Sequence, residues 1–319
     1  MIRLFSMSMT LFLILTSCSS QPKVLAYQAT DVPPTSTVTI EVSNTPELQT
    51  QQSSPTTTPS PTIITVIPVT PTPELTATPA EKWNPPGDLI APILLYHHVA
   101  ESNPSLRYYV PPAEFTKQMQ LLKVKGYNTI SINKLHETVV DGASIPLRPI
   151  VITFDDGAID VYQNAFPIMK KLGFTGTFYI PGKYLNGEGF VTTEMVKEMI
   201  SSGWEIGSHG MSHVDLTKSV SNSEELLGSR ILLEEKLSTP ITTFSYPFGV
   251  MDENIINKVK NAGYQNAVGL GFYAEHNINS QYFLSRIEIK HSTTLIDFEK
   301  KITTLIMVDG SLKSYLDIQ

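Results

Sequence analysis

Cysteine is almost absent from this chain, since its 319 residues contain only one, Cys18. A single cysteine excludes an internal disulfide, so core packing alone must stabilise the fold. Basic residues form no block after the N-terminal segment, and the net charge is −7. This balance argues against binding nucleic acid or anionic lipid through a basic patch, and it favours a neutral or cationic partner.

Residues 1–18 are predicted to be an export signal. Arg3 precedes a mostly apolar run that is too short to be a preferred membrane span, which is typical of a signal peptide. The run ends in Leu-Thr-Ser-Cys, which resembles a bacterial lipobox. This resemblance predicts that a lipid on Cys18 anchors an exported protein to the outer face of the cell membrane. The alternative is an ordinary signal peptide, an incidental cysteine and a secreted protein.

Residues 19–88 differ sharply in composition from the rest of the chain. They are rich in Thr, Pro, Ser and Gln and poor in aromatic residues, so they cannot bury enough apolar surface to offset the entropy of ordering. The sequence therefore predicts a disordered linker. An apolar stretch at residues 63–69 could pair as a strand, although Pro68 and the prolines around it argue against a stable one.

Residues 89–319 form the predicted folded domain. Strand-like apolar runs alternate there with helical patterns, which is typical of an α/β fold with parallel strands. The predicted strands are residues 93–96, 128–130, 150–154, 176–180, 204–206, 242–245, 266–268 and 283–287. The predicted helices are residues 112–125, 160–171, 193–202, 223–237 and 253–262.

Two adjacent carboxylates, Asp155 and Asp156, follow the predicted strand at residues 150–154. Ligands and catalytic groups collect at the carboxyl ends of parallel strands, and Gly157 allows a sharp turn beneath the acids. Because successive strand residues face opposite ways, one acid can bind a metal ion while the other faces a substrate. Taken alone, the pair could equally be a solvated turn.

A pair of histidines, His209 and His213, follows the predicted strand at residues 204–206. Their spacing brings both imidazoles to one ion, on a helical turn or in a compact loop. Two histidines and one carboxylate leave coordination positions open for water and substrate, which is the pattern of a hydrolytic metal site. A pair of surface histidines is the alternative.

Together these motifs resemble a known family. Residues 153–157 (TFDDG) and 208–213 (SHGMSH) resemble the polysaccharide deacetylase family, also called the NodB homology domain or carbohydrate esterase family 4. Residues 92–99 (PILLYHHV) and 244–249 (FSYPFG) resemble its branch of poly-N-acetylglucosamine deacetylases. The resemblance implies an α/β fold, a distorted and incomplete (β/α)7-type barrel with its groove at the carboxyl ends of the strands.

The resemblance also implies a role for each motif residue. Asp156, His209 and His213 would be the metal ligands, and Asp155 would be the general base. A ligated carboxylate is held ionised by the metal, whereas its neighbour stays free to accept a proton. The implied cofactor is one divalent ion, with Zn²⁺ the preferred choice and Co²⁺, Ni²⁺ or Fe²⁺ also compatible.

His97 is implied as the general acid that protonates the amine leaving group. Many relatives place this acid in a C-terminal L-x-x-H motif, which the sequence does not contain. His98 is expected to be a neighbour of the site rather than the acid, since successive strand residues face opposite ways. For His97, the alternative is a structural histidine near the groove.

Two positions depart from the family pattern. Ser245 stands where relatives carry an arginine that orients the base, and Arg286 on a late strand is our candidate replacement. Gly210 stands where Ser or Thr is usual, which removes a hydroxyl that would support the histidine loop.

The predicted substrate-binding or oxyanion residues are Tyr246, Pro247 and Phe248, together with Arg286. The predicted function is a monomeric, metal-dependent hydrolase that removes N-acetyl groups from an extracellular or cell-wall polysaccharide containing N-acetylglucosamine. An O-acetyl esterase acting on xylan-type polymers is one alternative. A non-catalytic carbohydrate-binding relic is the other, although such a relic would gain nothing from a base beside a metal site.

Overall fold

The structure is a computed structural model that describes residues 79–102, 105–218, 221–303, 305–308 and 311–314. The predicted signal peptide, Cys18 and most of the predicted linker lie outside these ranges. Within them, no helix is long and apolar enough to cross a membrane. Strand β1 (Glu81–Asn84) falls in the predicted linker but pairs antiparallel with β5 (Ala143–Pro146), so folded structure begins before residue 89.

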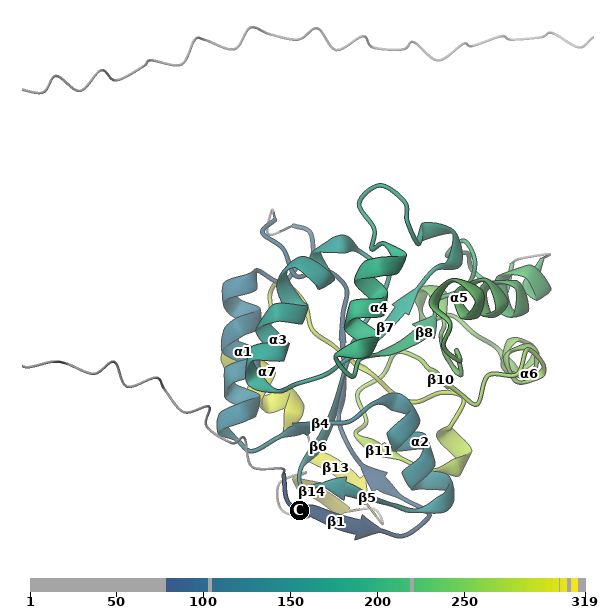
Figure 1. Cartoon of the computed structure of the whole chain (residues 1–319). Helices are drawn as coiled ribbons and strands as arrows, with labels where there is room; N and C mark the ends of the chain where they lie inside the picture. Colours follow the sequence, from purple (N-terminus) through teal and green to yellow (C-terminus); the bar gives the residue numbers. More distant parts are fainter. Residues whose placement is uncertain (1–78, 103–104, 219–220, 304, 309–310, 315–319) are drawn as a thin grey trace, which may run out of the picture. The chain divides into compact units, whose positions relative to one another are not determined.

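Parallel strands form a curled sheet (Figure 1), which confirms the predicted α/β class. Their order across the sheet is β10-β9-β8-β7-β6-β3-β12, and each neighbouring pair is parallel. They are β3 (Ile93–Tyr96), β6 (Pro149–Phe154), β7 (Thr177–Ile180), β8 (Glu205–Ser208), β9 (Thr243–Ser245), β10 (Asn266–Val268) and β12 (Ile287–Glu288). The short strand β4 (Asn128–Thr129) only pairs with the start of β6.

The segment around β12 closes this sheet. On one side β12 pairs with β3, and on the other isolated bridges join Leu284 to Val268 and Ile287 to Gly271. Regular strand geometry is limited to β12 itself, although the sequence predicted a strand over residues 283–287. This irregular segment pairs with both edges of the sheet, and the result is a distorted barrel.

Helices lie around the strands in Figure 1. They are α1 (Pro112–Val124), α2 (Ile132–Asp141), α3 (Phe166–Leu172), α4 (Thr193–Ser201), α5 (Ser229–Leu237), α6 (Glu253–Asn261) and α7 (Leu295–Ile302). Short helical turns are η1 (Val161–Ala165), η2 (Gly182–Tyr184), η3 (Glu224–Gly228), η4 (Pro247–Gly249) and η5 (Ile278–Ser280). The remaining strands are β2 (Leu89–Ile90), β11 (Glu275–His276), β13 (Leu305–Val308) and β14 (Ser311–Ser314).

Strand β6 lies at the centre of the core. All of its residues are buried, as expected for a parallel strand covered on both faces. The ring of Phe154 stacks with that of Tyr96 at 5.6 Å and with that of Trp204 at 5.5 Å between centroids. The next residue is Asp155, so the chain passes from the apolar core to the polar edge of the barrel within one residue.

Candidate active site and metal centre

A cavity of about 150 Å³ lies at the carboxyl ends of the strands. We call it the carboxyl-end cavity. The loops after β3, β6 and β8 and the segment around β12 meet there, as the fold predicts. Its lining includes His97, Asp155, Asp156, His209, His213 and Arg286.

A tight turn after β6 gives the two adjacent acids different surroundings. Asp156 has φ +73° and Gly157 has φ +72°. A side chain at Gly157 would also meet the Ile180 side chain at 3.1 Å, so this turn needs glycine. The Asp155 side chain is 4% exposed and that of Asp156 is 28% exposed, so one acid is enclosed and the other reaches the cavity.

Asp156, His209 and His213 could hold one metal ion. Each offers one ligand atom, and these atoms lie within 4.8 Å of one another. Asp156 Oδ1 lies 3.4 Å from His209 Nε2 and 3.3 Å from His213 Nε2, and it accepts no well-formed hydrogen bond from the described residues. Burial would raise the pKa of Asp156, but the two imidazoles outweigh burial and hold that pKa well below its usual range. Two imidazole nitrogens and one carboxylate oxygen that lacks a well-formed hydrogen bond are a ligand set that fits Zn²⁺.

The orientation of His209 suits a ligand. Its Nδ1 lies 2.8 Å from the backbone carbonyl oxygen of Ser245, to which it can only donate. This hydrogen bond leaves Nε2 as the free, electron-donating nitrogen on the side of Asp156. Burial alone would lower the pKa of His209, but Asp155 and Asp156 reverse that effect and raise it.

Arg286 reaches Asp155 from the segment that closes the barrel. Its Nη1 donates to Asp155 Oδ1 at 2.7 Å and its Nη2 to Oδ2 at 2.8 Å, which is the strong bidentate geometry. The Ser245 hydroxyl donates to Asp155 Oδ2 at 3.0 Å and lies 2.9 Å from Arg286 Nη2. Burial raises the pKa of Asp155, but Arg286 and His209 outweigh burial and keep that pKa below its usual value. Asp155 is therefore ionised at neutral pH.

His97 faces the same cavity. Its Nδ1 is buried without a hydrogen-bond partner in the described part of the chain, and its ring lies 4.5 Å from that of Tyr108. Burial lowers the pKa of His97 below 6.5, and the carboxylates of Asp155 and Asp156 oppose this shift. His98 turns elsewhere, as strand alternation predicts, since its Nδ1 contacts Asp160.

Of the predicted substrate contacts, Phe248 is the one most open to a polymer. Its ring is 58% exposed, its φ is +59°, and it lies 4.5 Å from the ring of His213. Tyr246 also lines the cavity but is 1% exposed, and its hydroxyl donates to the Tyr282 carbonyl at 2.9 Å. Pro247 is buried as well. Of these three side chains, only that of Phe248 is exposed enough to contact a ligand, because the ring of Tyr246 belongs to the core.

Three further lining residues escaped the sequence analysis, namely Tyr108, Leu270 and Glu288. Glu288 follows Arg286 by two positions, so strand alternation alone could have placed it on the same inward face. Tyr108 and Leu270 lie on loops, where no local pattern predicts which side chain faces the cavity.

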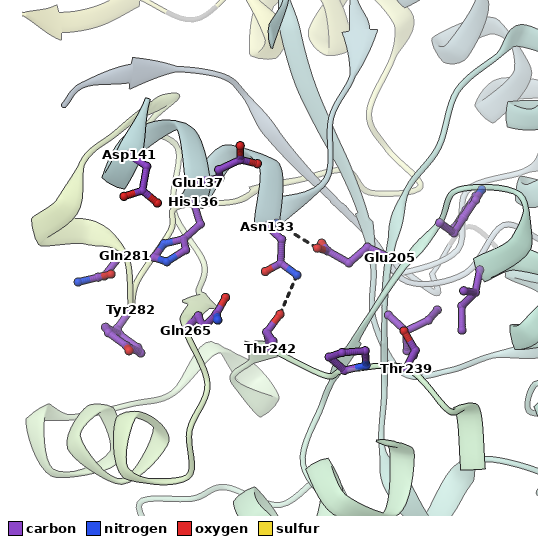
Figure 2. Close-up of a pocket in the computed structure, with 14 residues that line it drawn as sticks. Asn133, His136, Glu137, Asp141, Glu205, Thr239, Thr242, Gln265, Gln281 and Tyr282 are labelled. Carbon is purple, nitrogen blue, oxygen red and sulfur yellow. Dashed lines mark hydrogen bonds between the residues drawn. The ribbon is translucent and has the colours of Figure 1, made fainter. Parts of the chain in front are cut away.

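A second and larger cavity, of about 760 Å³, lies at the amino ends of β8, β9 and β10 (Figure 2). We call it the amino-end cavity. His136, Gln265 and Gln281 lie close together on its wall, while Asn133 lies between Glu205 and Thr242. Asn133 Nδ2 donates to Thr242 Oγ1 at 2.7 Å, and the Asn133 backbone N–H donates to Glu205 at 3.0 Å.

Comparisons with known proteins agree with this fold. The family model for polysaccharide deacetylases matches residues 144–267. YxkH of Bacillus subtilis (strain 168), which has the provisional name polysaccharide deacetylase, is 32% identical over 200 residues, covering 62% of this chain and 71% of that protein. The crystal structure of BC0361, a polysaccharide deacetylase from Bacillus cereus, matches with a TM-score of 0.60 and 30% identity, over 67% of this chain and 69% of that chain.

A more distant relative has a more specific name. The poly-β-1,6-N-acetyl-D-glucosamine N-deacetylase of Staphylococcus aureus (strain MSSA476) is 27% identical over 198 residues, covering 57% of this chain and 68% of that enzyme. Fold, motifs and relatives together define a hydrolase of N-acetyl amide bonds. The chain belongs to the polysaccharide deacetylase family.

Proposed function

We propose that this protein is a metal-dependent N-deacetylase of an extracellular or cell-wall polysaccharide that contains N-acetylglucosamine. The observation that carries the proposal is that an ion-paired carboxylate, Asp155, shares one cavity with the three-residue cluster of Asp156, His209 and His213. The name of the Staphylococcus aureus relative supports N-acetylglucosamine as the sugar unit.

Asp156, His209 and His213 would hold a divalent ion, with Zn²⁺ preferred. When bound, such an ion polarises the acetyl carbonyl and makes a nearby water more acidic. Asp155 takes a proton from the attacking water at its carboxylate, which Arg286 holds ionised and oriented. A carboxylate outside the ligand set can accept this proton without releasing the ion.

His97 gives a proton to the amide nitrogen as the C–N bond breaks, so that acetate and an amine leave. An amide nitrogen is a very poor leaving anion, which makes this proton necessary. Burial lowers the pKa of His97, whereas the Asp155 and Asp156 carboxylates and the negative charge that develops on the acetyl oxygen favour its protonated ring. The backbone N–H of Phe248 is the candidate donor to that oxygen.

Acetate release tests this function. The full chain, stripped of metal and then reloaded with Zn²⁺, is incubated with poly-β-1,6-N-acetylglucosamine, chitin oligomers and peptidoglycan. We expect metal-dependent release from at least one of them, and release at least about 100-fold slower from the Asp155→Asn variant. Release from acetylated xylan but from no acetamide would instead identify an esterase, and polymer binding without any release would identify a relic.

We also propose that the protein is exported and held at the outer face of the membrane by a lipid on Cys18, with the Thr/Pro/Ser-rich segment as its tether. The support is the lipobox-like sequence that ends at Cys18. Cys18→Ser should move the protein from the membrane fraction to the soluble fraction without changing its specific activity. Unchanged membrane association would mean that the apolar segment itself is retained.

A further inference from the structure

Two carboxylates behind the carboxyl-end cavity hold the loops that carry its candidate functional groups. Glu225, in η3, is 5% exposed, and Asp160 lies just before η1. Glu225 accepts hydrogen bonds from two backbone N–H groups between the candidate histidine ligands, and Asp160 accepts one from the backbone N–H two residues after His97. Neither carboxylate lines the described cavity. They are therefore placed to orient the site without touching a substrate.

Glu225 holds the loop between the two candidate histidine ligands. Its Oε2 accepts hydrogen bonds from the backbone N–H groups of Met211 and Ser212, each at 2.9 Å, and its Oε1 accepts from the Ser212 hydroxyl. The loop has positive φ at Gly210 (+78°) and His213 (+55°), so it follows neither helix nor strand. Because buried N–H groups need acceptors, the carboxylate replaces the hydrogen bonds that regular structure would supply.

Gly210 allows the carboxylate to come this close. A Cβ at this position would lie 3.2 Å from Glu225 Oε2, which is tight, and the positive φ disfavours any side chain there. The sequence comparison with the family predicted weaker support for this loop, because the usual hydroxyl is missing. In this chain Glu225 supplies support from outside the loop.

Asp160 holds the end of β3, where His97 lies. Its Oδ1 accepts a hydrogen bond from the Val99 backbone N–H at 2.8 Å, and its Oδ2 lies 2.6 Å from His98 Nδ1. Asn164 then donates to the Val99 carbonyl at 2.8 Å. The two residues that follow His97 are thus bound to the segment after β6, which fixes the direction in which the chain leaves His97.

The same segment connects two parts of the site. It begins with Asp155 and Asp156, and a few residues later it provides Asp160. Through Asp160, the position of the candidate acid is set relative to the candidate base. The histidine loop is held separately, by a helical turn that comes later in the chain.

We propose that Glu225 and Asp160 are positioning residues with separate tasks. Glu225 orients the metal-binding histidines, and Asp160 orients His97 for proton donation. The proposal rests on the proposed function, which gives the metal site and His97 their roles. It predicts that each carboxylate, when removed, affects a different measurable property.

The test uses the full chain and the variants Glu225→Ala and Asp160→Ala. Metal affinity is measured by competition with a chromophoric chelator, and site geometry by the visible spectrum of the Co²⁺ form. Glu225→Ala should weaken metal binding about 10- to 100-fold, the usual effect of removing a group that orients a ligand, and change the Co²⁺ spectrum. Asp160→Ala should leave affinity within about twofold and the spectrum unchanged, because it touches no ligand.

Turnover at saturating metal gives the complementary result. Asp160→Ala should lower kcat on an N-acetylglucosamine oligomer about 100-fold, since a misplacement of about 1 Å can cost that much. It should change hydrolysis of an activated aryl acetate by less than about threefold, because that leaving group needs no proton. Metal-saturated Glu225→Ala should affect both substrates equally.

Conservative variants protect the test against a simple folding defect. Asp160→Asn keeps an acceptor for the Val99 N–H and can donate to the other tautomer of His98, so it should recover most of the acetamide activity. Glu225→Gln keeps an acceptor for Met211 and Ser212 and should recover most of the metal affinity.

As a matched control, Asp252→Ala removes a carboxylate that accepts the Ile255 N–H at 2.7 Å at the start of α6. It should lower the Tm while leaving metal affinity and substrate preference unchanged.

The proposal would be overturned if both alanine variants lost metal affinity and both activities together, in proportion to their loss of Tm. Glu225 and Asp160 would then only stabilise the fold. If Asp160→Ala lost equal activity on the acetamide and on the aryl acetate, only the role assigned to Asp160 would be overturned. A wild-type protein that released no acetate would refute the proposed function instead. The proposal would still be decided by metal affinity, because it predicts weaker binding in Glu225→Ala but not in Asp160→Ala.

Discussion

The two cavities at opposite ends of the parallel strands contain similar side chains but use them differently. At the amino end, Glu205 is half-buried and its carboxylate accepts hydrogen bonds from the backbone of Ile132, the backbone of Asn133 and the hydroxyl of Thr177. Burial raises the pKa of Glu205, and these hydrogen bonds only partly oppose it. The Glu205 carboxylate thus accepts hydrogen bonds from the first backbone N–H groups of α2 and stabilises the N-terminus of this helix (Figure 2).

At the carboxyl end, some buried polar atoms have no hydrogen-bond partner among the described residues. Asp156 Oδ1 and His97 Nδ1 are buried there without a hydrogen-bond partner among the described residues. Three non-glycine residues with positive φ, namely Asp156, His213 and Phe248, border this cavity, whereas no residue described as lining the amino-end cavity has that strain. Of these two cavities, the larger one is lined by no such unsatisfied or strained residue among those described, so here the lining groups mark the candidate site better than cavity volume does.

Removing a metal ligand should have the largest effect. Asp156→Ala and His209→Ala should weaken metal binding by more than about 100-fold, beyond the loss expected for an outer hydrogen-bond partner, and abolish turnover. His136→Ala, which changes a histidine of the amino-end cavity, is the matched control and should retain the metal. Stoichiometric, tight Zn²⁺ in either ligand variant would show that the ligands are other residues.

Asp155→Asn should keep the metal and lose turnover about 10²- to 10⁴-fold, the range for loss of general base catalysis. The variant also leaves Arg286, which is 1% exposed, without its counter-charge, and this loss costs about 3 kcal/mol or more. Asp155→Asn combined with Arg286→Met should recover stability but not activity, as thermal unfolding and acetate release would show. Near-normal turnover in metal-loaded Asp155→Asn would exclude Asp155 as the base.

His97→Ala should lose acetamide hydrolysis about 10²- to 10⁴-fold while keeping much of its activity on aryl acetates, which need no protonated leaving group. His98→Ala should be milder on both substrates. Both assays are compared at matched metal occupancy. Equal loss on the two substrates would assign His97 to positioning rather than to proton donation.

At the amino end, a histidine should affect stability rather than catalysis. His276, in β11, is fully buried, its Nε2 lies 3.1 Å from the Ala91 carbonyl, and burial lowers its pKa from 6.5 to about 4. The unfolded chain thus binds this proton more readily, so the stability present above pH 6.5 falls as the pH drops toward 4. The loss should reach about 3 kcal/mol. His276→Phe should flatten the dependence of unfolding free energy on pH over this range, and an unchanged slope would refute the assignment.

The smallest effect is expected in the amino-end cavity itself. Gln265→Ala and Gln281→Ala remove half-buried or exposed amides that face this cavity, far from the reacting groups. Acetate release should change by less than about twofold and stability by less than about 0.5 kcal/mol, as for ordinary surface substitutions. A tenfold loss of activity on a long polymer but not on a short oligomer would mean that this cavity binds sugar too.

Much of the fold could be predicted because its signals are local. Residues 150–154 form an unbroken run of apolar or β-branched residues and occur within β6, and residues 112–125 have helical register and largely occur as α1. Helix α2 was missed, although Ser131 caps it and Ile132, Leu135 and Val139 form its buried face. A short helix with a mixed sequence depends on tertiary contacts, here the Glu205 carboxylate at its N-terminus, and such contacts are not visible in sequence.

The candidate site was predictable where one motif contains neighbouring residues, as in the acid and histidine pairs. The contact of Arg286 with Asp155 depends on the irregular closing strand, which sequence alone suggested only as a hypothesis. Ser245 was expected to be too short for the role of an arginine, but its hydroxyl contacts both partners of that ion pair. Glu225 and Asp160 escaped notice because nothing local distinguishes a carboxylate that binds a distant loop from one in solvent.

The closing strand also makes the proposed base depend on the last part of the folded domain. Asp155 and Arg286 are 131 residues apart, and the guanidinium arrives near the end of the chain. Before it arrives, a buried Asp155 would have no counter-charge from Arg286, and burial favours the neutral acid, which cannot accept a proton. If Asp155 is the base, as proposed, catalytic competence therefore waits for the last part of the fold, and a chain that ends before Arg286 would lack the guanidinium that orients this base.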